Sequence, residues 1–242
     1  MYPELFSIGN ITIYTYGVLV AIGFFAGMQY IVKYSKNIIT KQQVYDFLFY
    51  VILIGIVGAR LFYVVLNLSY YKSNPLEILQ VWKGGLVYYG GFVAVLIFAF
   101  FYCRHKKINI IKLTDIFAPA LALGHAFGRI GCFFSGCCYG KSSDCFLAIA
   151  HKHPTQLYEA FGNFIIFYIL HNRLKKSHKD GYVFVLYMIL YSLLRFFVEF
   201  FRGDDRGMFF LGLSPAQNIS IVIFVAAMVI LLFTKNGAKN EK

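Results

Sequence analysis

One stretch decides the fold of this chain: VYDFLFYVILIGIVGARLFYVVLN, residues 44–67. A helix needs about 20 mostly apolar residues to cross the hydrocarbon core of a bilayer, and this stretch is long enough to do so. Only Asp46 and Arg60 carry a formal charge within it. We therefore predict a transmembrane helix here, with one arginine inside it.

The composition extends this prediction to the whole chain. Of its 242 residues, 59% are hydrophobic and 14% are charged, whereas soluble domains have about 25% charged residues. The mean hydropathy is +0.64. A soluble fold of this length has too little interior to bury so much apolar surface, so lipid must solvate much of it. We predict an all-α membrane helix bundle, with residues 1–242 forming a single integral membrane domain.

Seven apolar runs qualify as spans. Short connections predict that neighbouring spans pack antiparallel. The spans are expected near residues 13–32, 44–67, 86–103, 115–134, 155–171, 182–201 and 213–234.

The basic residues predict the orientation. Outside the spans, fourteen lysines and arginines fall on the side of the C-terminus and six on the other side. Since basic residues accumulate in cytoplasmic loops, the N-terminus is predicted outside and the C-terminus inside. The same clustering argues against nucleic-acid binding as the meaning of the net charge of +12. The N-terminal flank carries Glu4 and no Lys or Arg, which is unlike a cleavable signal.

Three arginines fall inside apolar spans: Arg60, Arg129 and Arg195. In this topology all three lie in the outer half of the membrane, and Glu159 and Glu199 lie at similar depth. An arginine at mid-membrane costs about 2.5–3.5 kcal/mol on insertion scales. The arrangement favours a polar, outward-facing cavity that binds an anion. The alternative is structural pairing, because Arg195 and Glu199 are four residues apart on one helix face.

Two further motifs support an anion site. Residues 124–141, GHAFGRIGCFFSGCCYGK, place five glycines around Arg129. Such a stretch can break the helix and point backbone N–H groups and Arg129 at a phosphate. Residues 195–207, RFFVEFFRGDDRG, place Arg195 and Arg202 two turns apart with Glu199 between them. Guanidinium groups bind phosphate through paired hydrogen bonds.

Two other motifs are weaker when taken alone. Residues 81–94, VWKGGLVYYGGFVA, combine glycine pairs with tyrosines, which also fits helix packing beside an interfacial aromatic belt. Residues 153–159, HPTQLYE, predict a helix start with proline in its first turn. Their polar side chains could line the rim of the cavity or simply cap the helix.

The cysteines leave three interpretations open. Cys103 stands alone and is expected to be a small core residue. The others are expected on the outer side, where a structural disulfide, buried free thiols, or redox, metal or catalytic use are all compatible with their spacing. That spacing, C-x4-C-C-x6-C, is not a standard zinc pattern, and we expect no metal and no cofactor. These cysteines are Cys132, Cys137, Cys138 and Cys145.

These motifs, with GARLFYVV (residues 58–65) and LGLSPAQNISI (residues 211–221), occur in an order that resembles prolipoprotein diacylglyceryl transferases. The likeness runs from the second span to the seventh. It implies a multi-pass enzyme of the bacterial inner membrane with seven helices and an active site toward the periplasmic face. Such an enzyme moves the diacylglyceryl group of phosphatidylglycerol to the lipobox cysteine of a prolipoprotein.

The resemblance also implies roles for particular residues. Arg129 and Arg195 would hold the phosphoglycerol headgroup, Glu199 would orient Arg195, and Tyr89 would stand at the catalytic position where the family typically has histidine. The remaining substrate-binding residues implied are Arg60, Gly131, Gly140, His153, Gln156, Tyr158, Glu159 and Arg202.

The chain also departs from the family pattern. Cys132, Ser135 and Cys137 replace the usual Asn, Asn and Glu of the glycine-rich motif. Three alternatives to the transferase stay open: a related phospholipid-dependent transferase with another acceptor or donor, a membrane thiol–disulfide oxidoreductase, and a transporter or binding protein for an anionic solute.

Overall fold

The computed structural model describes residues 3–9, 11–204 and 212–236. Asp205, Arg206, Leu211, Lys239 and Lys242, which belong to the motifs and basic clusters above, lie outside these residues. The described chain divides into two compact units. The first joins residues 1–33 to residues 114–242, and the second comprises residues 34–113.

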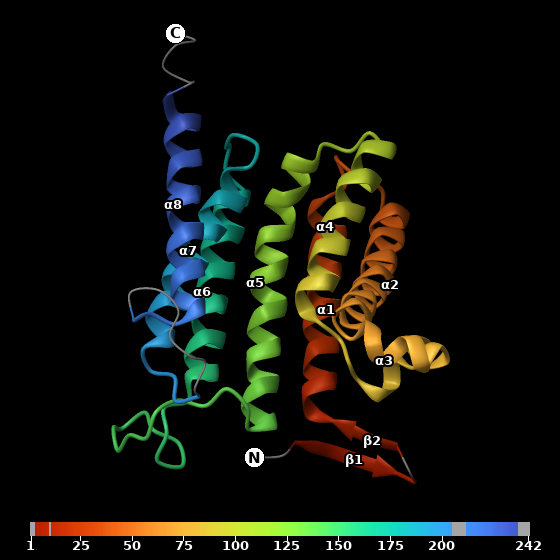
Figure 1. The fold of residues 1–242 in the computed structure, drawn as a ribbon. Helices are drawn as coiled ribbons and strands as arrows, with labels where there is room; N and C mark the ends of the chain where they lie inside the picture. Colours follow the sequence, from red (N-terminus) through yellow and green to blue (C-terminus); the bar gives the residue numbers. More distant parts are fainter. Residues whose placement is uncertain (1–2, 10, 205–211, 237–242) are drawn as a thin grey trace. The chain divides into compact units, whose positions relative to one another are not determined.

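The chain is mostly helical (Figure 1). Its longer helices coincide with the seven expected spans, with ends that differ by a few residues. They are α1 (Thr15–Tyr34), α2 (Lys41–Leu66), α4 (Tyr88–His105), α5 (Ile110–Ser135), α6 (Thr155–Leu174), α7 (Tyr182–Glu199) and α8 (Pro215–Asn236).

Six of these helices are long and apolar enough to cross a membrane. The exception is α6, which occupies the place of the fifth expected span but carries a buried polar face. Its buried residues include Gln156, Glu159 and Asn163. The chain is thus a multi-pass membrane protein, and α6 is the helix whose sequence is least typical of a span.

In the first unit, α6, α7 and α8 lie side by side (Figure 1). A core of small and branched side chains joins α5, α6 and the start of α7: Ala118, Ala122, Ile166, Leu170 and Val183. Small residues let helices approach closely, which is the usual way for membrane helices to pack.

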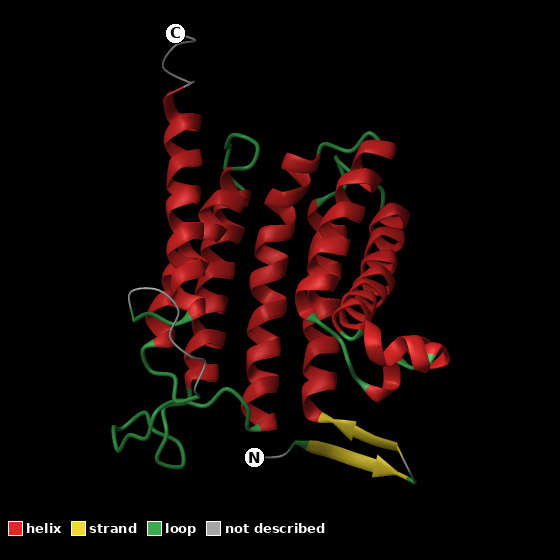
Figure 2. Cartoon of the chain, in the orientation of Figure 1, coloured by secondary structure: helices red, strands yellow, loops and turns green. Residues whose placement is uncertain are grey.

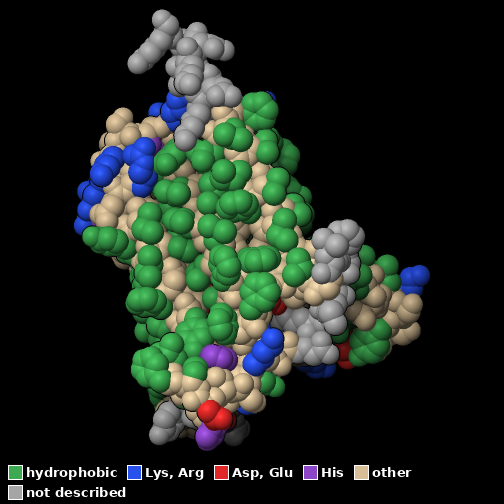
Figure 3. All heavy atoms as spheres, turned by 90° about the vertical axis from the view of Figure 1, so that its left-hand side faces the viewer, with side chains coloured by type: hydrophobic (Ala, Val, Ile, Leu, Met, Phe, Trp, Pro, Cys, Tyr) green, Lys and Arg blue, Asp and Glu red, His purple; other side chains and the backbone are tan. Residues whose placement is uncertain are grey.

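The outer surface of this unit is apolar. Figure 3 shows hydrophobic side chains across the middle of the face that includes α8. Phe197, Val222 and Phe233 are among the exposed residues. An apolar surface of this kind is suited to contact with lipid tails.

Asp115 ties α5 to the start of α7. Its carboxylate accepts hydrogen bonds from the backbone N–H groups of Gly181 (2.7 Å) and Phe184 (2.8 Å). The residue is buried, and His178 lies 3.5 Å from the same carboxylate. A negative group at a helix N-terminus satisfies orphan N–H groups and complements the helix dipole.

An N-terminal hairpin was not predicted. Strands β1 (Glu4–Ile8) and β2 (Ile11–Tyr14) pair antiparallel, and Figure 2 shows them as the two arrows before α1. The all-α assignment is therefore incomplete at this end. The alternation of Phe6, Ser7, Ile11 and Thr12 around a Gly-Asn pair is a hairpin pattern that the longer apolar runs obscured.

In the second unit, α2 packs against α4, and glycines make the approach close. A Cβ added to Gly90 would meet Phe62 and the carbonyl oxygen of Gly58, and one added to Gly91 would meet the carbonyl oxygen of Gly55. Along the sequence, α2 and α4 are connected by α3 (Leu68–Ser73) and two short 3-10 helices, η1 (Pro75–Leu79) and η2 (Val81–Lys83). The second glycine pair of the 81–94 motif, Gly90 and Gly91, thus allows α2 and α4 to pack closely.

The helix does not break at the glycines next to Arg129: α5 continues through Arg129 and ends at Ser135, close to the end of the span predicted near residues 115–134. Glycine is tolerated within a helix when packing compensates for its low propensity. Pro154 is the N-cap residue of α6, one position before the first turn in which we placed it.

Candidate functional site

A buried carboxylate joins three helices of the first unit. Glu159 of α6 is 1% exposed, and its Oε1 lies 3.0 Å from Nε of Arg129 on α5. Its Oε2 lies 3.7 Å from Nη1 of Arg195 on α7. His125 and Tyr191 also face this carboxylate, at 3.7 Å and 3.5 Å from Oε1. Two of the three arginines predicted inside apolar spans, Arg129 and Arg195, therefore converge on Glu159.

Arg195 has a second, closer partner. Its Nη2 lies 2.7 Å from Oε2 of Glu199, one turn further along α7. Glu199 in turn accepts a hydrogen bond from the Ser214 hydroxyl, just before α8, at 2.9 Å. Arg202 approaches Glu199 at 3.7 Å. The two glutamates thus hold Arg195 between them.

Arg202 is directed toward a different carboxylate. Its Nε and Nη2 donate to Oδ1 and Oδ2 of Asp204 at 2.8 and 2.7 Å, the paired geometry that guanidinium and carboxylate favour. The backbone next to it is paired too, because Gly140 and Arg202 form an antiparallel bridge. A Cβ on Gly140 would collide with His153, which explains why glycine stands there.

Arg129 keeps hydrogen-bonding capacity. Its Nε lies 3.0 Å from Oε1 of Glu159 as an ion pair, but this buried Nε has no hydrogen bond among the described residues. The side chain is 17% exposed, whereas that of Glu159 is 1% exposed. Arg129 is thus a partly exposed guanidinium of the network that can donate to an incoming anion.

The polar start of α6 anchors the loop that follows α5. The buried side chains of Thr155 and Gln156 donate hydrogen bonds to the carbonyl oxygens of Cys138 and Cys137. His153 Nδ1 lies 3.1 Å from the Tyr158 hydroxyl. These predicted site residues therefore position the loop, and the HPTQLYE motif does more than cap a helix.

All five cysteines are free thiols in the structure, which does not contain the disulfide left open above. Three of them gather at the end of α5: the Sγ atoms of Cys132, Cys137 and Cys138 lie within 4.8 Å of one another. Hydrogen bonds from the Cys132 thiol and then from the Arg202 guanidinium lower the pKa of the Cys138 thiol. Within the described residues these three offer donors for a metal ion.

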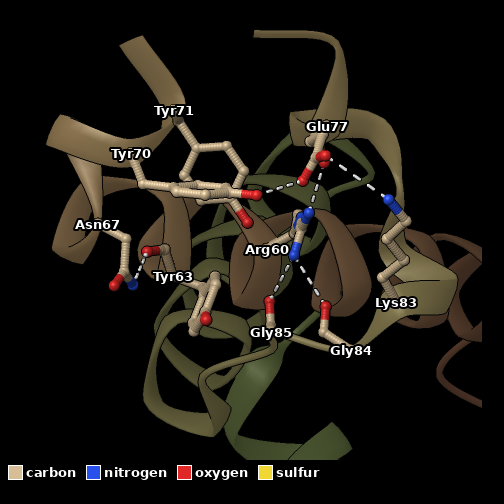
Figure 4. Close-up of a pocket in the computed structure, with 9 residues that line it drawn as sticks. All are labelled: Arg60, Tyr63, Asn67, Tyr70, Tyr71, Glu77, Lys83, Gly84 and Gly85. Carbon is tan, nitrogen blue, oxygen red and sulfur yellow. Dashed lines mark hydrogen bonds and ion pairs between the residues drawn. The ribbon is translucent and has the colours of Figure 1, made fainter. Parts of the chain in front are cut away.

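Arg60 belongs to the second unit, where it binds backbone (Figure 4). Its guanidinium donates to the carbonyl oxygens of Glu77, Ile78, Gly84 and Gly85 at 2.6 to 3.1 Å. These bonds hold the segment between α3 and α4 over the end of α2.

A cavity of about 400 Å³ lies beside Arg60. Figure 4 shows its tyrosines and the Glu77 carboxylate, which accepts from the Tyr70 hydroxyl at 2.8 Å and pairs with Lys83 at 3.6 Å. Tyr89 also belongs to this unit. It is 64% exposed and contacts Tyr88 edge to face.

Several residues of the site escaped sequence reasoning. Ser214 and Asp204 lie within quoted motifs, but nothing in their spacing distinguishes them from ordinary loop residues. Tyr16 of α1 stands against Gly131, where an added Cβ would lie 3.0 Å from its ring. The aromatic content of the chain is so high that no single tyrosine stands out.

Fold and site together define a multi-pass membrane protein with a buried arginine–glutamate network. Comparison with known proteins gives the family: the sequence profile described as "prolipoprotein diacylglyceryl transferase" matches residues 3–233. This chain belongs to that family.

Individual relatives agree along nearly the full length. A phosphatidylglycerol–prolipoprotein diacylglyceryl transferase of Finegoldia magna is 38% identical over 244 residues, covering 98% of each chain. Its namesake in Clostridium tetani is 34% identical and covers 95% of this chain and 96% of the relative. A third, from Rickettsia bellii, is 34% identical over 250 residues.

Proposed function

We propose that this protein transfers the diacylglyceryl group of phosphatidylglycerol to the lipobox cysteine of prolipoproteins. The observation that carries the proposal is the Arg129–Glu159–Arg195 network, in which a buried carboxylate holds two guanidinium groups from different helices. Family membership supplies the reaction, and the network supplies a site for its phosphate.

The charge change of the reaction fits this network. The phosphodiester of phosphatidylglycerol carries one negative charge, and the departing glycerol phosphate carries up to two. Arg129, whose side chain is 17% exposed and whose Nε has no hydrogen bond within the described residues, would donate to the phosphate and stabilise this developing charge. Arg195, held by Glu159 and Glu199, would supply a second positive charge at a fixed position.

The other predicted residues have supporting roles in this proposal. Gln156, His153 and Tyr158 fix the loop after α5, while Gly131 and Gly140 allow close approach of neighbouring groups. Arg202 stabilises the end of α7 through Asp204. Arg60 holds the segment between α3 and α4, and Tyr89 follows this segment in the first turn of α4.

The membrane arrangement is part of the proposal. We infer seven spans, with α6 as the fifth, in the bacterial inner membrane. The distribution of lysine and arginine supports an outer N-terminus and a cytoplasmic C-terminus. In that orientation the end of α5, the start of α6 and the end of α7 face the periplasm.

Complementation tests the function. A bacterium depleted of its own transferase would express this chain, and the mass of a reporter prolipoprotein would be followed. The expected gain is one diacylglyceryl unit. Arg129→Ala should reduce the rate by about 10²–10³, the usual loss for one charge-stabilising group.

A matched control tests whether the loss of rate is specific to the arginine at this site, or whether removal of any arginine would cause it. Arg104→Ala removes an exposed arginine near the end of α4 and should leave the transfer unchanged. No mass gain from well-inserted protein, or equal rates for Arg129→Ala and Arg104→Ala, would contradict the proposal.

A further inference from the structure

Three free thiols lie together at the end of α5, and the function proposed above uses none of them. The Sγ atoms of Cys132, Cys137 and Cys138 are all within 4.8 Å of one another. Cys132 belongs to the last turn of α5, and Cys137 and Cys138 follow in the loop. Two of the three are partly buried and Cys137 is exposed, so an ion or a small molecule can reach the thiols from the protein surface.

The backbone holds these thiols together. Gly136 and Cys138 both have positive φ angles, +74° and +62°. A positive φ is uncommon for a residue other than glycine and persists only where its surroundings fix it. Here the buried side chains of Thr155 and Gln156 fix it, since they bind the carbonyl oxygens of Cys138 and Cys137. The three thiols are therefore held as a group before any ligand arrives.

We propose that Cys132, Cys137 and Cys138 bind a zinc ion whose open fourth position receives the acceptor thiol of the substrate. Zinc–sulfur bonds of about 2.3 Å in tetrahedral geometry place sulfur atoms about 3.8 Å apart, so the thiols need to close by only about 1 Å. Catalytic zinc sites have three protein ligands and one open position. Among the described residues, no His, Asp or Glu joins the three thiols as a fourth ligand.

The surrounding charge suits such a site. Zinc with three thiolates carries a net charge of −1, and a fourth thiolate makes it −2. The positive charge of Arg202 acts on the Cys138 thiol, and Arg129 lies three residues before Cys132 on α5. Nearby positive side chains favour a negatively charged complex of this kind.

The second half of the inference rests on the proposed function. Zinc would bind the acceptor cysteine as its thiolate, and the thiol proton would pass to solvent. The sulfur would then form a bond to the terminal glyceryl carbon of the lipid. The bond from that carbon to the phosphate oxygen would break, and its electron pair would leave with glycerol phosphate. No oxidant or reductant is needed.

Metal uptake tests the site without any transfer reaction. Full-length protein in detergent would be reduced, freed of reductant and loaded with Zn²⁺ or Co²⁺. We expect one ion per chain and, with Co²⁺, the visible and near-ultraviolet absorption of a tetrahedral thiolate site. Cys137→Ser and Cys138→Ser should each weaken binding at least about tenfold, whereas Cys145→Ser, outside the group, should not.

Two results would overturn the site. One is wild-type protein that takes up no more metal than Cys138→Ser. The other is a disulfide between two of the three thiols in protein purified without reductant, together with no metal uptake after reduction. That second result would assign the group to thiol–disulfide chemistry.

A lipobox peptide with a single cysteine tests the open position. Added to Co²⁺-loaded protein, it should intensify the sulfur-to-cobalt absorption, and the same peptide with serine should not. An unchanged spectrum at an intact cobalt site would overturn the role in acceptor binding. If the peptide thiol bound the metal but the zinc-loaded protein transferred no diacylglyceryl group, the proposed function would be refuted. The metal site would still be supported.

Discussion

Glu159→Gln removes one negative charge from the centre of the site with little change of shape. Arg129 has a single ion-pair partner among the described residues, and that partner is Glu159. Arg195 would keep Glu199 at 2.7 Å. The substitution therefore leaves one partly buried guanidinium, that of Arg129, without a carboxylate.

The expected loss of stability follows from this geometry. Removing one member of a buried ion pair costs about 3–5 kcal/mol. The glutamine oxygen can still accept a hydrogen bond from Arg129 or Tyr191, so we expect the lower end of that range, about 3 kcal/mol. The equilibrium constant for unfolding would then rise by roughly two orders of magnitude.

Titration with sodium dodecyl sulfate in mixed micelles, followed by circular dichroism, would measure this loss. Glu77→Gln is the matched control, because Glu77 and its partner Lys83 are 32% and 57% exposed at a distance of 3.6 Å. An exposed pair contributes about 0–1 kcal/mol. If the two variants differed by less than about 0.5 kcal/mol, the ion pairs of Glu159 would not stabilise the fold more than an exposed pair does.

Three other substitutions test separate parts of the structure. Gly140→Ala should displace the loop after α5, because its Cβ would collide with His153, and limited proteolysis should cleave the loop faster than in Gly17→Ala, whose Cβ meets nothing. Asp115→Asn should cost about 1–2 kcal/mol in the detergent titration, since it weakens the cap of α7; an unchanged midpoint would contradict that role. Arg60→Lys should speed proteolysis of residues 74–85 at unchanged helix content, because one ammonium cannot replace four bonds to carbonyl oxygens; equal cleavage rates would argue against it.

The helices were predictable from sequence because the length of an apolar run is itself the physical requirement for crossing a bilayer. That requirement says little about short elements. The hairpin of β1 and β2 has only five and four residues per strand, too few to stand out beside the apolar run of α1. Whether α5 breaks at the glycines around Arg129 was left open for another reason: glycine spacing alone cannot distinguish a break from a close helix contact.

Within the site, only the contacts between residues close together in the sequence were predictable. Arg195 and Glu199 pair as their spacing of four residues indicates. Glu159 was expected near the cavity, but its place between Arg129 and Arg195 depends on how α5, α6 and α7 pack together. The clustering of Cys132 with Cys137 and Cys138 depends on backbone turns after α5, which sequence spacing does not encode.

The buried polar face of α6 has a consequence for how the protein is made. A segment that carries Gln156, Glu159 and Asn163 partitions poorly from the translocon into lipid, since a charged side chain there costs a few kcal/mol. That cost falls when Arg129 of the preceding helix and Arg195 of the next one supply partners. During synthesis, we therefore expect α6 to stay beside α5 until α7 has been made and then to enter the bilayer together with α7. The charge of Glu159 would by then be paired with Arg129 and Arg195.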